Sequence, residues 1–301
     1  EIYTLSLHDA LPIFGRNRLR GEGEVFGNMF LEDRTRKVIL QGNYGFYNEK
    51  TEYGMATDSA FAIDYSQKES LFIHGDTLLM TTDSLFRNIK AYHQVRFYRS
   101  DLQGICDSMH YASRDSMLYM IGDPVVWNEN NQVMGGRIDI FMNDTTVDKA
   151  LIKENAMAIQ SRIGAKDQFN QLSGKEMTAY FRNGDIYHLM VEGNAESLYY
   201  LLDSDSTMIG LNKTESPFLS MDIENQRIKK LKLWDQVTGM TTPLPQLSPG
   251  ADRLKGFAWL DYLRPSGPDD IFRKNERNSA DALETRPRTF VRAAKDRKSV
   301  V

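Results

Sequence analysis

Short stretches in which apolar and polar residues alternate run through most of this chain, and they constrain its fold more than any other feature. In residues 89–97 the odd-numbered positions are mostly apolar and the even-numbered positions are mostly polar. A period of two is typical of a half-buried β-strand. Similar stretches occur at residues 71–74, 117–121, 137–141, 187–191 and 197–202.

Turn signals and a recurring unit organise these strands. Glycine paired with Asn or Asp, which favours the positive φ of tight turns, occurs at residues 42–43, 75–76, 122–123, 183–184 and 193–194. The motif Asp-Ser-apolar-aromatic begins at Asp58 and Asp83, with a looser copy at Asp107, so the spacings are 25 and 24 residues. A unit of that size holds two strands and two turns. The sequence therefore predicts an all-β fold, an open β-jellyroll or solenoid-like roll of repeated short antiparallel strands. The best helical candidate, residues 148–161, is weak.

Composition excludes several classes of protein. The 301 residues are 41% apolar and 26% charged, which is ordinary for a globular protein. No apolar run approaches the roughly 18–20 residues that a membrane-spanning helix needs. The net charge of −4 disfavours nucleic acid as a partner. A single cysteine excludes an internal disulfide and any zinc site built from several cysteines.

Both ends of the chain are predicted to be artefacts. Residues 7–13 can be encoded by CTA CAC GAC GCT CTT CCG ATC, and the reverse complement of that string encodes residues 296–301 followed by a stop. The string also resembles a common short-read sequencing adapter. We therefore interpret residues 1–13 and 296–301 as translated adapter, and expect a native signal peptide to have been lost with the true start.

The remaining chain divides into a strand-rich body and a tail. The body, residues 14–242, is the predicted β-jellyroll domain. In the tail, residues 243–295, five of the nine prolines fall between Pro243 and Pro268. An apolar island at residues 256–263 is a candidate for docking on the body, and residues 273–295 are polar and basic without periodicity, so partial disorder is expected.

The sequence supports no catalytic, metal or cofactor site. Cys106 and His110 would share a strand face, but four residues of strand separate them by roughly 13 Å, too far for a hydrogen bond. The other histidines of the body, His74, His93 and His188, lack metal-ligand spacing. The recurring Asp-Ser pairs suit turn hydrogen bonding. The basic stretch 227–233 suits a solvated strand edge better than an anion site.

The function depends on what the apolar faces of the strands pack against. Two sheets that close on each other would make a dry core, and the same two sheets splayed into a V would line a groove for acyl chains. Periodicity alone leaves both outcomes open, and a one-residue register error inverts the inward face of a strand. The candidate groove residues are Ile73, Ile89, Ala91, Val95, Phe97, Met117, Tyr119, Ile121, Ile138, Ile140, Leu189 and Val191.

The recurring turn-plus-strand units resemble those of the OstA-like (organic solvent tolerance-like) family, to which periplasmic lipopolysaccharide-transport proteins of the LptA type belong. The similarity covers most of residues 20–233 and is closest to the long, Bacteroidetes-type form. The units that carry it are Ala56-Thr-Asp-Ser-Ala-Phe61, Ile73-His-Gly-Asp-Thr-Leu78, Thr82-Asp-Ser-Leu-Phe86, Gly104-Ile-Cys-Asp-Ser-Met-His-Tyr111 and Val191-Glu-Gly-Asn-Ala195.

The resemblance implies a function and partners. It implies a non-enzymatic periplasmic protein that shelters the acyl chains of lipid A and takes part in lipopolysaccharide transport and outer-membrane assembly. It also implies stacking through edge strands on other transport-bridge proteins or on further copies of the chain as a homo-oligomer. The alternative is a closed β-solenoid scaffold that binds proteins and no lipid.

Overall fold

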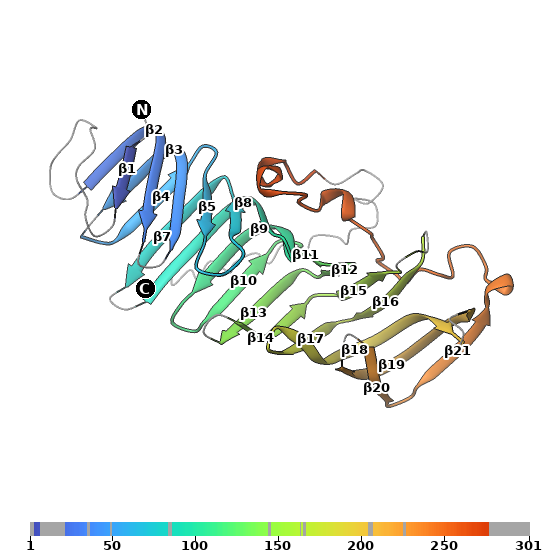
Figure 1. Ribbon diagram of the computed structural model, residues 1–301. Helices are drawn as coiled ribbons and strands as arrows, with labels where there is room; N and C mark the ends of the chain where they lie inside the picture. Colours follow the sequence, from blue (N-terminus) through green and yellow to red (C-terminus); the bar gives the residue numbers. More distant parts are fainter. Residues whose placement is uncertain are drawn as a thin grey trace, which may run out of the picture.

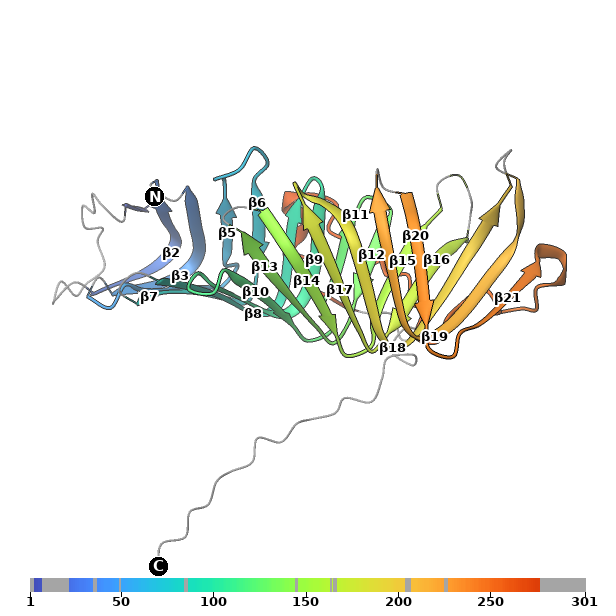
Figure 2. The ribbon, with the colours of Figure 1, turned by 90° about the horizontal axis from the view of Figure 1, so that it is seen from below.

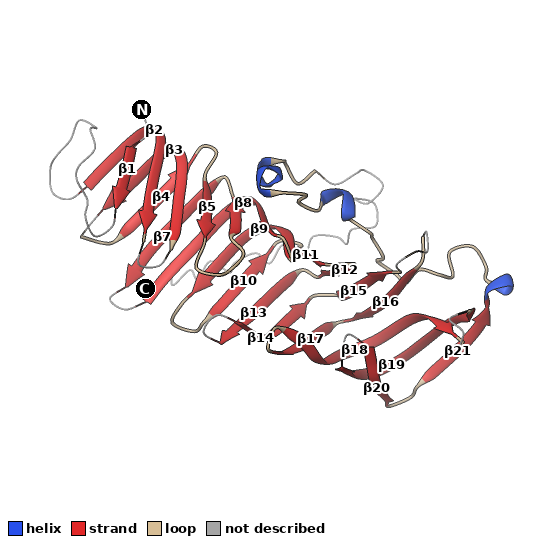
Figure 3. Ribbon diagram, in the orientation of Figure 1, coloured by secondary structure: helices blue, strands red, loops and turns tan. Residues whose placement is uncertain are grey.

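The computed structural model describes residues 3–6, 22–34, 37–48, 50–83, 86–143, 146–162, 164, 167–203, 207–224 and 227–276. In this part of the chain, 21 strands form one continuous sheet, and the three helices present are short 3₁₀ turns (Figures 1 and 3). All pairings between strands of the body are antiparallel. The predicted all-β fold, an open roll of short antiparallel strands, is confirmed.

The sheet bends along its whole length into two walls, which we name wall A and wall B. Seven strands lie only in wall A: β4 (Tyr53–Thr57), β7 (Thr77–Asp83), β10 (Met117–Ile121), β13 (Arg137–Asn143), β14 (Thr146–Lys153), β17 (Glu176–Arg182) and β20 (Arg227–Trp234). Seven lie only in wall B: β5 (Phe61–Asp64), β6 (Leu71–His74), β11 (Val125–Asn128), β12 (Asn131–Met134), β15 (Ala156–Ser161), β16 (Phe169–Gly174) and β21 (Thr238–Pro243).

Six longer strands cross from one wall to the other and so tie the walls together. They are β2 (Glu22–Asp33), β3 (Val38–Asn48), β8 (Phe86–Arg99), β9 (Leu102–Ala112), β18 (Asp185–Leu202) and β19 (Met208–Glu224). In β8, for example, the first half pairs with β7 of wall A and the second half pairs with β6 of wall B.

The corners form a line along the roll, which we name the seam. They fall at pairs of residues with positive φ: Asp58 and Ser59, His93 and Gln94, Gly122 and Asp123, Glu154 and Asn155, and Gly193 and Asn194. Main-chain hydrogen bonds join successive corners, as in Asp76 N to His93 O at 3.0 Å and Lys175 N to Gly193 O at 2.8 Å. The sequence signals at Gly122 and Gly193 therefore mark corners rather than hairpin ends.

Two of these corners require glycine. Gly122 has a φ of 81° and Gly193 a φ of 76°, a region that L side chains rarely adopt. A Cβ on either would also lie 2.5 Å from the Cβ of Asp107 or 2.7 Å from the Cβ of Lys175. Because neighbouring strands approach so closely here, the walls meet without a gap at the seam.

The core has an inner and an outer part. The inner cluster lies between the walls and includes Val95, Met120, Val191 and Leu219. The outer clusters lie on the far face of wall B, where Met157 and Trp127 are fully buried. Wall B is thus apolar on both faces, whereas the large buried apolar side chains of wall A belong to the inner cluster.

The outer clusters are completed by the end of the described chain, residues 244–276, which we name the strap. It turns back after β21 and runs beside β16, β12, β11 and β9 toward β6 (Figure 1). Its three helices are η1 (Leu244–Gln246), η2 (Asp261–Leu263) and η3 (Pro268–Phe272). The apolar island at residues 256–263 lies within the strap.

Two details of the sequence analysis need correction. The weak helical candidate at residues 148–161 is wrong, because the segment forms β14 and β15, one in each wall, with a corner at Glu154 and Asn155. The Asp-Ser motifs do not mark equivalent places, since those at Asp58 and Asp107 lie at the seam and the one at Asp83 ends β7.

The predicted adapter segments are mostly beyond what the structure describes. Residues 7–13 and 296–301 lie outside the described residues, whereas residues 3–6 form β1 (Tyr3–Ser6). β1 pairs in parallel with β2, which is the first strand of the antiparallel series. The adapter origin of these ends stays a prediction.

Candidate functional site: an apolar trough between the walls

Inward-facing side chains of wall A are buried near the seam and only half-buried further from it. In β10, Met120 is fully buried, and Leu118, two residues further from the seam, is only half-buried. In β13, Ile138 is buried and Ile140 is half-buried. The same change occurs along β19 from Leu219 to Met221.

Wall B shows the same gradient in β15, where Ala156 is 1% exposed and Ala158 is half-buried. Two walls that packed face to face would bury both ends of each strand equally. From the gradient on both walls we infer that they part with distance from the seam, and Figure 2 shows their strands diverging from the common line of corners. The result is a V-shaped apolar trough that runs along the roll. Its floor, at the seam, is filled by buried side chains. Its open edges, which we name the lips, are formed by the inward residues furthest from the seam.

Nine of the predicted groove residues lie on the inner face. Six are buried members of the inner cluster: Ala91, Val95, Phe97, Ile138, Leu189 and Val191. Ile73 and Ile140 pack against that cluster. Ile89 pairs with Met80, which also packs there, and cross-strand partners share a face. The structure thus brings these nine together, whereas their contact with lipid stays a prediction.

The other three predicted groove residues, all in β10, face away from the trough. Leu118 and Met120 belong to the inner face, so Met117, Tyr119 and Ile121 alternate onto the outer face, where Ile121 is 46% exposed. The predicted register of this strand was wrong by one residue. All five residues of β10 are apolar or aromatic, so the pattern held no information about which face is buried.

Cys106 and His110 do not share a face, contrary to the sequence prediction. β9 crosses the seam between them, so Cys106 joins the inner cluster and Met109 follows it there, which turns His110 outward. Burial raises the pKa of the Cys106 thiol, which therefore stays protonated at neutral pH. A buried, protonated thiol is a poor nucleophile.

The histidines are likewise separate from one another. His188 Nδ1 lies 2.7 Å from Asp222 Oδ1, and the hydrogen bond from His188 lowers the pKa of that carboxyl group. His110 Nε2 lies 3.3 Å from Asn88 Oδ1. Among the described residues, no three His, Cys, Asp or Glu side chains are grouped closely enough to hold a metal ion.

In the part of the chain that the structure describes, no helix is long and apolar enough to cross a membrane.

Buried glutamines hold the strap on wall B. Gln132, fully buried in β12, donates from Nε2 to the carbonyl of Ala258 at 2.7 Å and accepts from the N–H of Leu260 at 2.8 Å. Gln171 in β16 repeats this pattern with the carbonyl of Asp252 and the N–H of Leu254, both at 2.8 Å. Each amide side chain therefore pairs with the main chain of the strap as a neighbouring strand would.

A buried arginine anchors the far end of the strap. Arg96 Nη1 donates to Asn275 Oδ1 at 2.8 Å and Nε to the carbonyl of Asp270 at 3.1 Å. Burial, together with the nearby Arg273, lowers the pKa of Arg96 to about 10, so its charge is retained at neutral pH. A buried cation is tolerable only with such partners.

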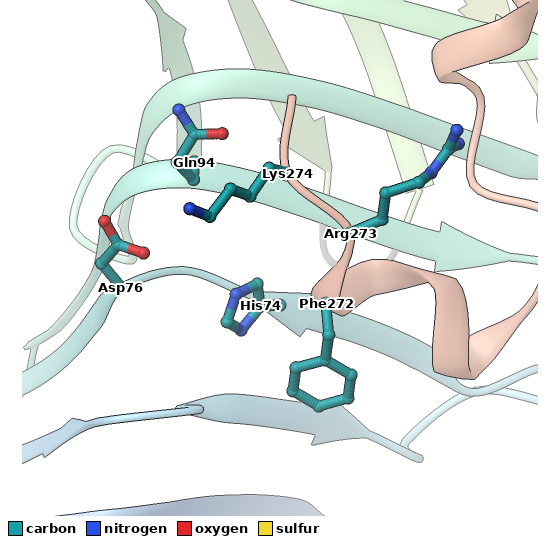
Figure 4. Close-up of a pocket in the computed structure, with 6 residues that line it drawn as sticks. All are labelled: His74, Asp76, Gln94, Phe272, Arg273 and Lys274. Carbon is teal, nitrogen blue, oxygen red and sulfur yellow. The ribbon is translucent and has the colours of Figure 1, made fainter. Parts of the chain in front are cut away.

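A polar pocket of about 360 Å³ lies at this end of the strap (Figure 4). It is lined by His74, Asp76, Gln94, Phe272, Arg273 and Lys274. His74 Nδ1 is 2.7 Å from the carbonyl of Ala60, and burial lowers the pKa of His74. A second pocket of about 350 Å³ lies beside η2, so both are on the outside of wall B, away from the trough.

Sequence reasoning missed the polar side chains that hold the strap. Gln103, in the wall-B half of β9, accepts from Arg264 Nε of the strap at 2.7 Å. Like Gln132 and Gln171, it lies beside an apolar inward residue, so a signal existed: a glutamine where the outer face is otherwise apolar. The basic stretch at residues 227–233 forms β20, which pairs only with β19 among the described strands. Its lysines thus lie along an edge, as expected.

The fold and the site define a class: an open all-β roll of two walls with an apolar trough between them and a strap on the outside of one wall. Among solved structures, the chain is similar to LptH, described as the LptA-homologous periplasmic component of the conserved lipopolysaccharide transport device from Pseudomonas aeruginosa. The similarity covers 47% of this chain and 95% of that one, at 12% identity and a TM-score of 0.36. No protein-family model matches the chain, and no curated protein sequence matches it.

Proposed function

We propose that this protein is a non-enzymatic periplasmic carrier whose trough shelters the acyl chains of lipopolysaccharide on the way to the outer membrane. The observation that carries the proposal is the exposure gradient on the two inner faces. Half-buried apolar residues of wall A, such as the cross-strand partners Leu118 and Ile140, face wall B across the open lips. The resemblance of the repeats to the OstA-like family supplies the substrate class.

The energetics suit a carrier. Burial of acyl chains contributes about 0.8 kcal/mol per CH₂ group. Because apolar contacts are non-directional, a chain held between the lips can move along the trough without breaking specific bonds. The floor of the trough is already filled by residues such as Val95 and Val191. We therefore place the acyl chains between the lips rather than at the seam.

The ends of the sheet suit a bridge. Among the described strands, residues 22–26 of β2 pair only with β3, since β1 covers residues 29–32, and β21 pairs only with β19. Strand edges of this kind offer unpaired N–H and C=O groups as a template for another chain. We propose that copies of the chain or other transport-bridge proteins stack on these edges and make the trough continuous.

Site-specific photo-crosslinking in lipopolysaccharide-producing cells tests the proposal. Leu118 faces the trough and Tyr119, the next residue of β10, faces outward, so they form a matched pair. With a photoreactive amino acid at Leu118 we expect adducts that contain lipopolysaccharide, and at Tyr119 we expect none. Equal lipid labelling at both positions, or protein adducts alone at Leu118, would leave the closed scaffold as the better account.

A further inference from the structure

The two lips of the trough differ in chemistry. On wall A, the inward residues far from the seam are apolar and half-buried: Leu118, Ile140, Ala150, Phe181, Ile186 and Ile223. On wall B, the corresponding positions of β11, β12, β15, β16, β18, β19 and β21 form a row of neutral polar residues, which we name the amide row: Asn128, Asn131, Gln160, Asn170, Tyr199, Asn212 and Thr241. None of the seven is charged.

Alternation along the strands places the amide row on the inner face. Gln160 lies two residues from Ala158, which packs on the inner cluster, and Asn170 lies two residues from Leu172, a member of that cluster. At the other end of the row, Asn212 follows Leu211, which is buried in the outer cluster and so faces the opposite way.

Neighbouring members of the row are cross-strand partners joined by hydrogen bonds. Gln160 pairs with Asn131 on one side and with Asn170 on the other. Gln160 Nε2 donates to Asn131 Oδ1 at 3.2 Å, and Asn170 Nδ2 donates to Gln160 Oε1 at 3.1 Å. Further along, Asn212 Nδ2 donates to Thr241 Oγ1 at 3.0 Å. The NH₂ groups of Gln160, Asn170 and Asn212 each use one hydrogen in the row, and no partner is found for the second among the described residues.

We propose that the amide row binds the uncharged, hydroxyl-rich head of an amphiphile, such as a sugar, whose acyl chains lie against the apolar lip of wall A. Amide groups offer both donors and acceptors, as hydroxyl groups do. Phosphate would instead favour arginine or lysine. Because the same groups recur on strands about 4.8 Å apart, the head meets similar partners at successive positions along the trough. This inference rests on the proposed function and adds the orientation of the bound amphiphile.

Two detergents with the same dodecyl chain and different heads test the inference. Dodecyl maltoside carries sugar hydroxyls, and dodecylphosphocholine carries none. Their binding to the full chain is measured by isothermal titration calorimetry below their micelle concentrations. We expect maltoside to bind about 5- to 10-fold more tightly, as two or so additional hydrogen bonds would give.

Variants on each lip separate the contribution of the detergent head to binding from that of its dodecyl chain. The double variant Gln160→Ala/Asn170→Ala should lose the preference for maltoside and keep its affinity for phosphocholine. The control Ile140→Ser, on the apolar lip, should weaken both detergents by the same factor. If the double variant fails to fold, as judged by circular dichroism, the single variant Gln160→Ser gives the same comparison with a smaller change.

The outcomes distinguish the two proposals. A wild-type protein that binds both detergents equally, or a double variant that keeps the preference, overturns the role of the amide row and leaves the apolar trough standing. A wild-type protein that binds neither detergent overturns the trough as a lipid site, and the amide row with it.

Discussion

The substitution Gln132→Leu should undock the strap. It removes the partner of three buried groups: the indole N–H of Trp127 at 3.1 Å, the N–H of Leu260 at 2.8 Å and the carbonyl of Ala258 at 2.7 Å. A buried polar group left without a partner costs about 1–3 kcal/mol. The added apolar contacts of leucine offset part of this, so we expect a loss of about 3–5 kcal/mol. The loss of stability cannot exceed the free energy of docking of the strap on wall B. Once the strap is undocked, water can hydrogen-bond to the polar groups that Gln132 had satisfied.

Tryptophan fluorescence during urea unfolding measures this loss. Trp127 and Trp259 lie in the contact between wall B and the strap, whereas Trp234 lies on β20 in wall A. In a Trp234→Phe background, the signal therefore follows the strap. The matched control is Gln160→Leu, an exposed glutamine of the same wall, which should change the stability by less than about 1 kcal/mol. A loss below about 1 kcal/mol for Gln132→Leu would refute the account of the buried amides.

Three further predictions concern buried groups elsewhere. Leu260→Ala should cost about 2–5 kcal/mol in the same assay, against less than about 1 kcal/mol for the more exposed Tyr262→Ala, and equal costs would contradict the packing of the strap. Burial lowers the pKa of His74 below 6.5, so the unfolded chain takes up a proton at higher pH than the folded chain does. Stability should therefore fall as the pH drops from about 7 to about 5, and His74→Asn should show a smaller fall; an unchanged slope would contradict this. Cys106 should resist alkylation by iodoacetamide in the native protein at neutral pH and react in urea, and fast native alkylation would show that the thiol is exposed.

The fold was predictable where it depends on the local sequence pattern, that is, on alternation within a strand and on turn residues. Strand alternation placed β6 and β10 at their observed bounds, residues 71–74 and 117–121. The stretches at residues 187–191 and 197–202 are two halves of β18, because a corner at Gly193 and Asn194 bends a strand without ending it. Turn chemistry alone does not distinguish a corner from a hairpin.

The candidate site was predictable only where one strand face is clearly more apolar than the other. In β13, Ile138 and Ile140 alternate with Asp139, so their inward direction follows from the pattern. In β15, residues 156–159 read Ala-Met-Ala-Ile, since that strand is buried on the inner side by wall A and on the outer side by the strap. A strand covered on both faces loses its alternation.

The sequence by itself determined that this chain is a β protein, where its strands alternate, and where glycine permits the chain to turn sharply. Only the tertiary structure decided which face of β10 looks inward, that the walls part at their lips, and that Gln132 and Gln171 bind the strap. The physical reason is that alternation depends on neighbours within one strand, whereas facing, opening and docking depend on contacts between different strands and segments, such as Gln132 with Leu260.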